Sequence, residues 1–122
     1  MTPEQEATSR YLVEARNTDG SLVFPQFGGC WHNVIPEESE DGYLCSICRQ
    51  WRRSPYSWNP DLFTWPSFGI LWEGMQAREY WEEFYSECVD YYACCGGMQL
   101  MENLINPATF PFTVAAYLKG LK

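Results

Sequence analysis

The feature that most constrains this 122-residue chain is a set of three cysteines and one histidine. The first pair is Cys30 and His32, the second is Cys45 and Cys48, and His32 is the only histidine in the sequence. A Cys-x-x-Cys pair can grip a metal ion from one side, and a Cys-x-His pair can grip it from the other. Three thiolates and one imidazole form a donor set that Zn²⁺ takes in closed tetrahedral sites. The pattern therefore predicts a structural zinc ion that supplies folding free energy to a small region without a core of its own.

The same pattern argues against zinc catalysis. A catalytic zinc keeps one coordination position for water and needs a nearby general base, whereas four protein ligands fill the shell here. With His32 assigned to the metal, no histidine remains for a Cys-His or Ser-His-Asp set. Adjacent carboxylates such as Glu82 and Glu83 would point roughly 100° apart on a helix, so they would not converge. We predict that the protein is not an enzyme.

The charge of the chain limits the classes of partner that we expect it to bind. The formal net charge is −8 at pH 7, and the basic side chains gather only at Arg49, Arg52 and Arg53, which form a short cluster. Direct binding to nucleic acid is therefore not expected, because phosphate backbones are bound by extended basic surfaces. An acidic surface suits a basic protein partner, although it can also serve solubility alone.

Membrane and export signals are not predicted. No apolar run approaches the roughly 20 residues of a membrane-spanning helix, and the N-terminus is polar and acidic rather than signal-like. The six cysteines then read as thiols or metal ligands, which are typical of a reducing cytoplasm. Cys88, Cys94 and Cys95 are predicted to be buried free thiols, with a redox pair or a further metal site as alternatives.

The helical signals indicate a mainly helical α+β fold. Thr2, Pro3 and Gln5 form a helix start with a capping box. Apolar residues at helical spacing predict a second helix, which begins at Thr64-Trp65-Pro66. A third is predicted over 78–92, a short one over 98–104, and a last one from Asn106-Pro107. The inward sides of these helices are predicted to carry Phe68, Leu71, Trp72, Met75, Trp81, Phe84, Tyr85, Cys88, Phe110, Val114, Tyr117 and Leu118.

We predict one compact domain, residues 1–122. Its zinc-knuckle subregion covers about 28–53, and its helical region covers about 64–119. Two short strands, Tyr43-Leu44-Cys45 and residues 49–53, would be joined by the knuckle as a small zinc-tied β-hairpin. Residues 33–42 read as an exposed acidic loop.

Two surfaces are candidates for contact with a partner protein. One is the acidic loop, and the other is the acidic side of the third predicted helix. The candidate residues are Glu37, Glu38, Glu40, Asp41, Glu79, Glu82, Glu83 and Glu87. An alternative is a site for a small ligand or nucleotide signal, in which an indole and guanidinium groups cradle a phosphate-bearing molecule. It would use Arg49, Trp51, Arg52 and Arg53, although the favoured interpretation is that these arginines pair with the acidic loop.

Several short motifs over about residues 30–119 give the chain a resemblance to known proteins. They are Cys30-Trp31-His32, Cys45-Ser46-Ile47-Cys48, Asn59-Pro60-Asp61, Trp65 with Leu71-Trp72-Glu73 and Met75-Gln76, and Asn106-Pro107-Ala108-Thr109-Phe110. In these the chain resembles small uncharacterised proteins encoded by tailed bacteriophages and prophages. The resemblance carries over the four metal positions and no activity.

By analogy, small acidic phage proteins without enzymatic activity are often host-takeover factors. The expectation is an accessory protein that binds a host bacterial protein in the cytoplasm of an infected cell. Inhibition of CRISPR–Cas or of another bacterial immune system would be such a role.

Overall fold

The computed structural model describes residues 2–37, 41–54, 58–93 and 106–120. These residues form a mainly helical α+β fold with a small antiparallel sheet, as the sequence predicted. The elements, in chain order, are α1 (Pro3–Glu14), the 3-10 helix η1 (Pro25–Phe27), β1 (Val34–Glu37), β2 (Gly42–Cys45), β3 (Trp51–Arg52), α2 (Trp65–Gln76), α3 (Trp81–Ala93) and α5 (Phe110–Gly120).

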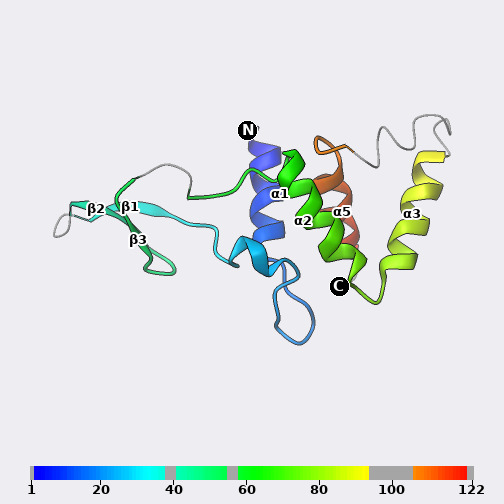
Figure 1. Cartoon of the computed structure of the whole chain (residues 1–122), viewed down its shortest axis with the longest axis horizontal. Helices are drawn as coiled ribbons and strands as arrows, with labels where there is room; N and C mark the ends of the chain where they lie inside the picture. Colours follow the sequence, from blue (N-terminus) through cyan, green and yellow to red (C-terminus); the bar gives the residue numbers. More distant parts are fainter. Residues whose placement is uncertain (1, 38–40, 55–57, 94–105, 121–122) are drawn as a thin grey trace.

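The sheet and α3 lie at opposite ends of the molecule, with α1, α2 and α5 side by side between them (Figure 1). The hydrophobic core is formed by the helices, by the segment that follows α1, and by Leu62 in the segment before α2. Its buried members are Leu12, Val13, Val23, Phe24, Leu62, Leu71, Met75, Phe84, Cys88, Phe110, Val114, Ala115 and Leu118. None of these residues comes from the sheet.

Helix α1 begins where the capping signals predicted. The Thr2 side chain accepts a hydrogen bond from the Gln5 N–H, and the Gln5 side chain accepts one from the Thr2 N–H. Pro3 occupies the first turn, where its missing N–H is not needed. The helix then packs Leu12 and Val13 into the core, and Lys119 of α5 lies 4.8 Å from the Tyr11 ring centroid. Helices α1 and α5 are thus held by both apolar and cation–π contacts.

The predicted inward residues of the other helices are mostly confirmed. Phe110 of α5 is fully buried, and its ring contacts Phe68, Trp72 and Phe84 with centroids 4.9, 5.6 and 6.2 Å away. Tyr85 is the exception, because 41% of it is exposed. Helix α3 sits at the edge of the helical layer, so its neighbours cover only one side of it (Figure 1).

The β-structure is larger than the predicted hairpin. The predicted pair of strands exists as β2 and β3, and β1 adds a third strand in the order β1-β2-β3. The expectation of a loop over the whole of residues 33–42 is therefore wrong for Val34–Glu37 and for Gly42, the first residue of β2. Pro36 tolerates this strand because β1 lies at the edge of the sheet, where a missing N–H breaks no ladder.

Some predictions fall outside the described residues. These are the short helix over 98–104, the state of Cys94 and Cys95, and the placement of Glu38 and Glu40. Among the residues described, no helix has the length and apolar character needed to cross a membrane.

Candidate metal centre

The structure brings the four predicted ligands together. Cys30 and His32 come from the segment before β1, Cys45 is the last residue of β2, and Cys48 lies in the turn before β3. Their donor atoms all lie within 4.8 Å of one another. Cys45 is buried, Cys30 and His32 are half-buried, and Cys48 is exposed. These four side chains can hold a metal ion at the edge of the protein surface.

Two of the distances between donor atoms are close to those of a tetrahedral metal site. The Cys30 and Cys45 sulfurs are 3.8 Å apart, and the Cys48 sulfur is 3.4 Å from His32 Nδ1. Metal–sulfur bonds of about 2.3 Å in a tetrahedron place neighbouring sulfurs about 3.8 Å apart, and a shorter metal–nitrogen bond gives about 3.6 Å. A disulfide would need about 2.05 Å, and the four described cysteines, Cys30, Cys45, Cys48 and Cys88, are free thiols.

The backbone of the knuckle presents N–H groups to the sulfur of Cys45. The Ile47 N–H donates to this sulfur at 3.4 Å, while the Arg49 N–H donates to the Cys45 carbonyl at 2.9 Å. The tight turn places Arg49 in the left-handed region, with φ at 66°. The Cys-x-x-Cys spacing therefore does more than bring two thiols close, because it also stabilises negative charge on one of them.

The thiol pKa values show how the cluster distributes charge. Burial would by itself raise the pKa of Cys45, but hydrogen bonds from the Cys48 and Ile47 N–H groups and from His32 lower it to about 5. Burial and the neighbouring sulfurs of Cys45 and Cys48 instead raise the pKa of Cys30 to about 12. One sulfur thus favours the thiolate while its neighbour at 3.8 Å resists a second negative charge. A bound dication would relieve that repulsion, because it attracts both thiolates.

Two residues that support the centre were missed by the sequence argument. The Asn59 side chain accepts from the His32 N–H at 2.7 Å and donates to the His32 carbonyl at 2.9 Å. The Trp58 ring meets the His32 ring edge-on with centroids 5.3 Å apart, and Arg52 lies over Trp58 at 4.8 Å. Asn59 and Pro60 belong to one of the motifs of the resemblance, but that motif gave no indication of a contact with His32.

The predicted acidic contact residues form two separate groups. Glu37 is half-buried at the end of β1, and Asp41 is exposed immediately before β2. The other four, Glu79, Glu82, Glu83 and Glu87, are exposed on α3 or just before it. The sheet and α3 lie at opposite ends of the molecule, so the helices α1, α2 and α5 separate the two groups (Figure 1).

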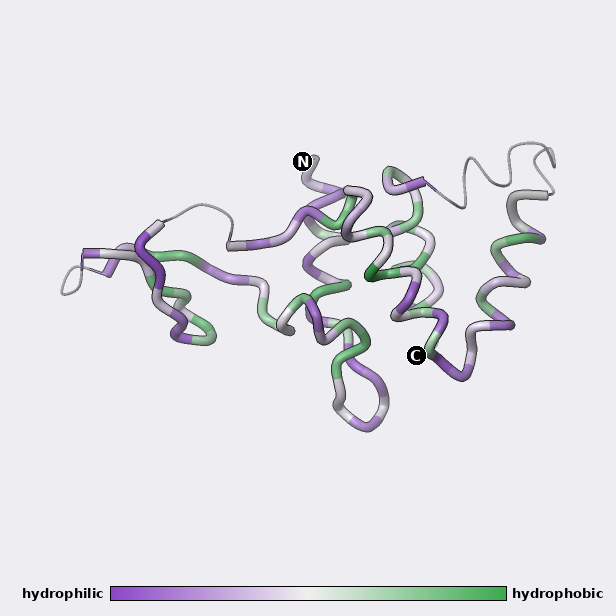
Figure 2. Tube along the Cα trace, viewed as in Figure 1, coloured by the Kyte–Doolittle hydropathy of each residue, from purple (hydrophilic) through white to green (hydrophobic). Residues whose placement is uncertain are grey.

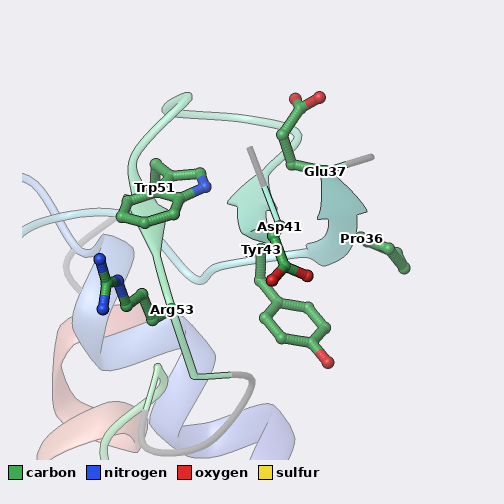
Figure 3. Close-up of a pocket in the computed structure, with 7 residues that line it drawn as sticks. Pro36, Glu37, Asp41, Tyr43, Trp51 and Arg53 are labelled. Atoms are coloured by element: carbon green, nitrogen blue, oxygen red, sulfur yellow. The ribbon is translucent and has the colours of Figure 1, made fainter. Parts of the chain in front are cut away.

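The residues of the alternative ligand site are only partly brought together. Trp51 and Arg53 line an open hollow of about 730 Å³ at the hairpin end of the sheet (Figure 3). Arg52 lies over Trp58 instead, and Arg49 sits in the knuckle turn; neither is among the described residues of the hollow. The other described lining residues are Pro36, Glu37, Asp41, Gly42 and Tyr43.

Comparison with known proteins does not identify this chain. The chain matches no family model, no curated protein and no solved structure.

Proposed function

We propose that the protein is a non-enzymatic, zinc-stabilised binding protein that occupies a basic surface of a host bacterial protein. The observation that carries the proposal is the convergence of Cys30, His32, Cys45 and Cys48, with all donor atoms within 4.8 Å. Four protein donors leave no coordination position for a substrate, so the metal serves the fold.

Zinc is the ion that best suits the donor set. Three thiolates and one imidazole are soft or borderline ligands, which disfavours Mg²⁺ and Ca²⁺ because those ions take oxygen donors. The 3.8 Å separation of the Cys30 and Cys45 sulfurs is that of neighbouring sulfurs on one tetrahedral ion. When bound, zinc supplies folding free energy by tying the segment before β1 to the turn after β2.

Charge and resemblance support a protein partner. The net charge of −8 and the exposed acidic groups at both ends of the molecule favour a basic surface. The resemblance to small proteins of tailed bacteriophages suggests that this surface belongs to a bacterial host protein. Inhibition of CRISPR–Cas or of another immune system is the role that this analogy proposes.

The nucleotide-binding alternative stays a prediction. Glu37 and Asp41 line the same hollow as Trp51 and Arg53, and their carboxylates disfavour a phosphate-bearing ligand. Ultraviolet absorbance of the filtrate after heat denaturation would reveal a nucleotide that had co-purified with the protein. We expect no such absorbance.

Native mass spectrometry of protein expressed in bacteria tests the zinc site. We expect one zinc per chain for the wild type and none after Cys45→Ser. Cys88→Ala is the matched control, because it changes another buried thiol far from the centre and should keep the zinc. A folded wild-type chain with no metal would overturn the zinc assignment.

Co-purification followed by binding kinetics tests the partner. A host protein retained by the zinc-loaded chain should associate more slowly as salt rises, because opposite charges steer the encounter. One variant replaces Glu82, Glu83 and Glu87 with Lys, and a second replaces Glu37 and Asp41 with Lys. Association should slow in the variant whose altered group faces the partner. Unchanged kinetics for both variants would rule out a charge-guided contact.

A further inference from the structure

The register of the sheet places three hydrophobic side chains in one row. Ile35 is opposite Leu44, and Leu44 is opposite Trp51. Directly opposite residues in antiparallel strands project from the same side of a sheet. Ile35 is 38% exposed and Trp51 is 37% exposed, so the row faces outward. We call this side the outer face.

The metal centre lies on the other side of the sheet. Because side chains alternate along a strand, Tyr43 and Cys45 project opposite to Leu44. Arg52, which pairs with Tyr43, lies over Trp58, and Trp58 contacts His32. The outer face is therefore not needed to hold the metal. Figure 2 shows hydrophobic stretches on the strands as well as on the helices, although the core cluster contains no strand residue.

Gly42 fixes the position of the Trp51 ring on the outer face. A Cβ atom on Gly42 would lie only 2.5 Å from Cζ2 of Trp51. The indole therefore lies directly against the Gly42 backbone and buries it. A rigid aromatic side chain that is half covered by its own protein is well suited to be a binding anchor, because little side-chain entropy remains to be lost.

The hollow beside Trp51 has an acidic rim. Glu37 and Asp41 line it together with Arg53, so the carboxylates outnumber the guanidinium groups among its described lining residues. Figure 3 shows Trp51 and Glu37 on one side of the strands and Tyr43 on the other. An indole face next to carboxylates is a favourable environment for a guanidinium or ammonium group.

We propose that the outer face of the sheet docks a basic segment of a partner protein. An apolar side chain of that segment covers the Ile35–Leu44–Trp51 row, and an Arg or Lys side chain enters the hollow beside Trp51. The inference rests on the proposed function and names the contact surface for it. A second copy of this chain is disfavoured as the occupant, because two chains of net charge −8 repel each other.

A peptide titration of the zinc-loaded full chain tests the proposal. The probe is a synthetic hexapeptide of alternating Arg and Leu, and the control peptide alternates Glu and Leu. Isotope-labelled protein followed by NMR should show saturable shifts at β1, β2, β3 and the Trp51 indole N–H with the Arg peptide only. Trp51→Ala should weaken this binding by about 10-fold or more, as expected for a central aromatic anchor.

Two further variants separate the anchor from general effects. Trp65→Ala is the matched control, because Trp65 is the more exposed indole at 61% yet lies at the start of α2, and it should leave the affinity unchanged. Gly42→Ala should also weaken binding, because it displaces the Trp51 ring without removing a contact group. Zinc content by native mass spectrometry checks that each variant retains its metal centre.

The possible results have different consequences. Shifts that centre on Glu82, Glu83 and Glu87 would overturn the docking surface but keep the proposed function. Equal affinity of the wild type and Trp51→Ala would do the same. No saturable binding of the Arg peptide anywhere on the chain would count against both. Strand shifts that depend on protein concentration without peptide would assign the outer face to self-association instead.

Discussion

The helices and the sheet differ in where their hydrophobic side chains lie. Among the helices, residues such as Leu71, Met75 and Phe110 are fully buried in one shared core. In the sheet, Cys45 is the one fully buried hydrophobic residue among those described, whereas Ile35 and Trp51 are more than a third exposed. The helices therefore exclude water from their apolar side chains more completely than the sheet does.

This difference teaches that the two regions depend on different interactions. Burial of apolar surface stabilises the helices. A three-stranded sheet with so few buried side chains is marginal in water, so we expect it to depend on the contacts around the candidate metal centre. The two regions meet at Asn59. Its side chain hydrogen-bonds the His32 backbone, and Asn59 itself lies three residues before Leu62, which is buried in the helical core.

Removing the metal should have the largest effect. Chelation or Cys45→Ser removes a binding free energy of about 10 kcal/mol or more, the size measured for small zinc-dependent folds. We expect the amide hydrogens of β1, β2 and β3 to exchange freely while those of α1, α2 and α5 stay protected. Peptide-resolved hydrogen exchange measures this. Simultaneous loss of protection in both regions would mean that they unfold as one unit.

A cavity in the helical core should come next. Phe110→Ala removes a fully buried ring that contacts three other aromatic rings, and we expect the free energy of unfolding to fall by about 3–5 kcal/mol. Urea unfolding followed by circular dichroism measures the change. Tyr85→Ala, a change of an exposed aromatic residue, should cost less than about 1 kcal/mol. The zinc content should stay at one per chain, and its loss would show that the metal centre depends on this core.

Loss of the Asn59 contacts should weaken metal binding moderately. Asn59→Ala removes both hydrogen bonds to the His32 backbone, and we expect zinc affinity to fall by about 10-fold, as for other groups that orient a ligand. Competition with a chromophoric chelator measures the affinity. Asn59→Asp keeps the hydrogen-bond acceptor, so its zinc affinity should lie between those of the wild type and Asn59→Ala. Asn33→Ala, which loses only a bond to the Ser46 side chain, is the control and should match the wild type.

Removal of the α1 cap should have the smallest effect. Thr2→Ala deletes the acceptor for the Gln5 N–H, and we expect the free energy of unfolding to fall by about 1 kcal/mol. Thermal unfolding compared with the exposed-site control Thr18→Ala measures it. Zinc affinity should not change, and a change would show that α1 stabilises the sheet as well as the helices.

Local sequence signals were sufficient to predict most of the helices and the four candidate metal ligands. The Thr2–Gln5 capping box depends on residues three apart, and the Leu71–Met75 spacing reports one turn of helix, so both are visible in a short window. The four ligands could also be predicted from the sequence, because the chemistry of metal donors restricts them to few residue types.

The missed features depend on contacts between distant residues. β1 contains Pro36 and ends at Glu37, and it becomes a strand only because β2 pairs with it. Asn59 and His32 are 27 residues apart, and nothing local to Asn59 indicates that its amide bridges a ligand backbone. Tyr85 fits the helical period of α3, but its exposure is decided by which neighbours cover that helix.

The separation of the two faces of the sheet has a consequence for how such a protein changes over generations. On the inner side, four residues at fixed positions could hold a metal ion, whereas on the outer face Ile35 and Trp51 are each more than a third exposed. Substitutions at Ile35 are therefore expected to change the proposed docking surface at a smaller cost in stability than substitutions at the four ligand positions. If the outer face docks partners as proposed, a lineage that keeps Cys30, His32, Cys45 and Cys48 could acquire new partners with the same scaffold.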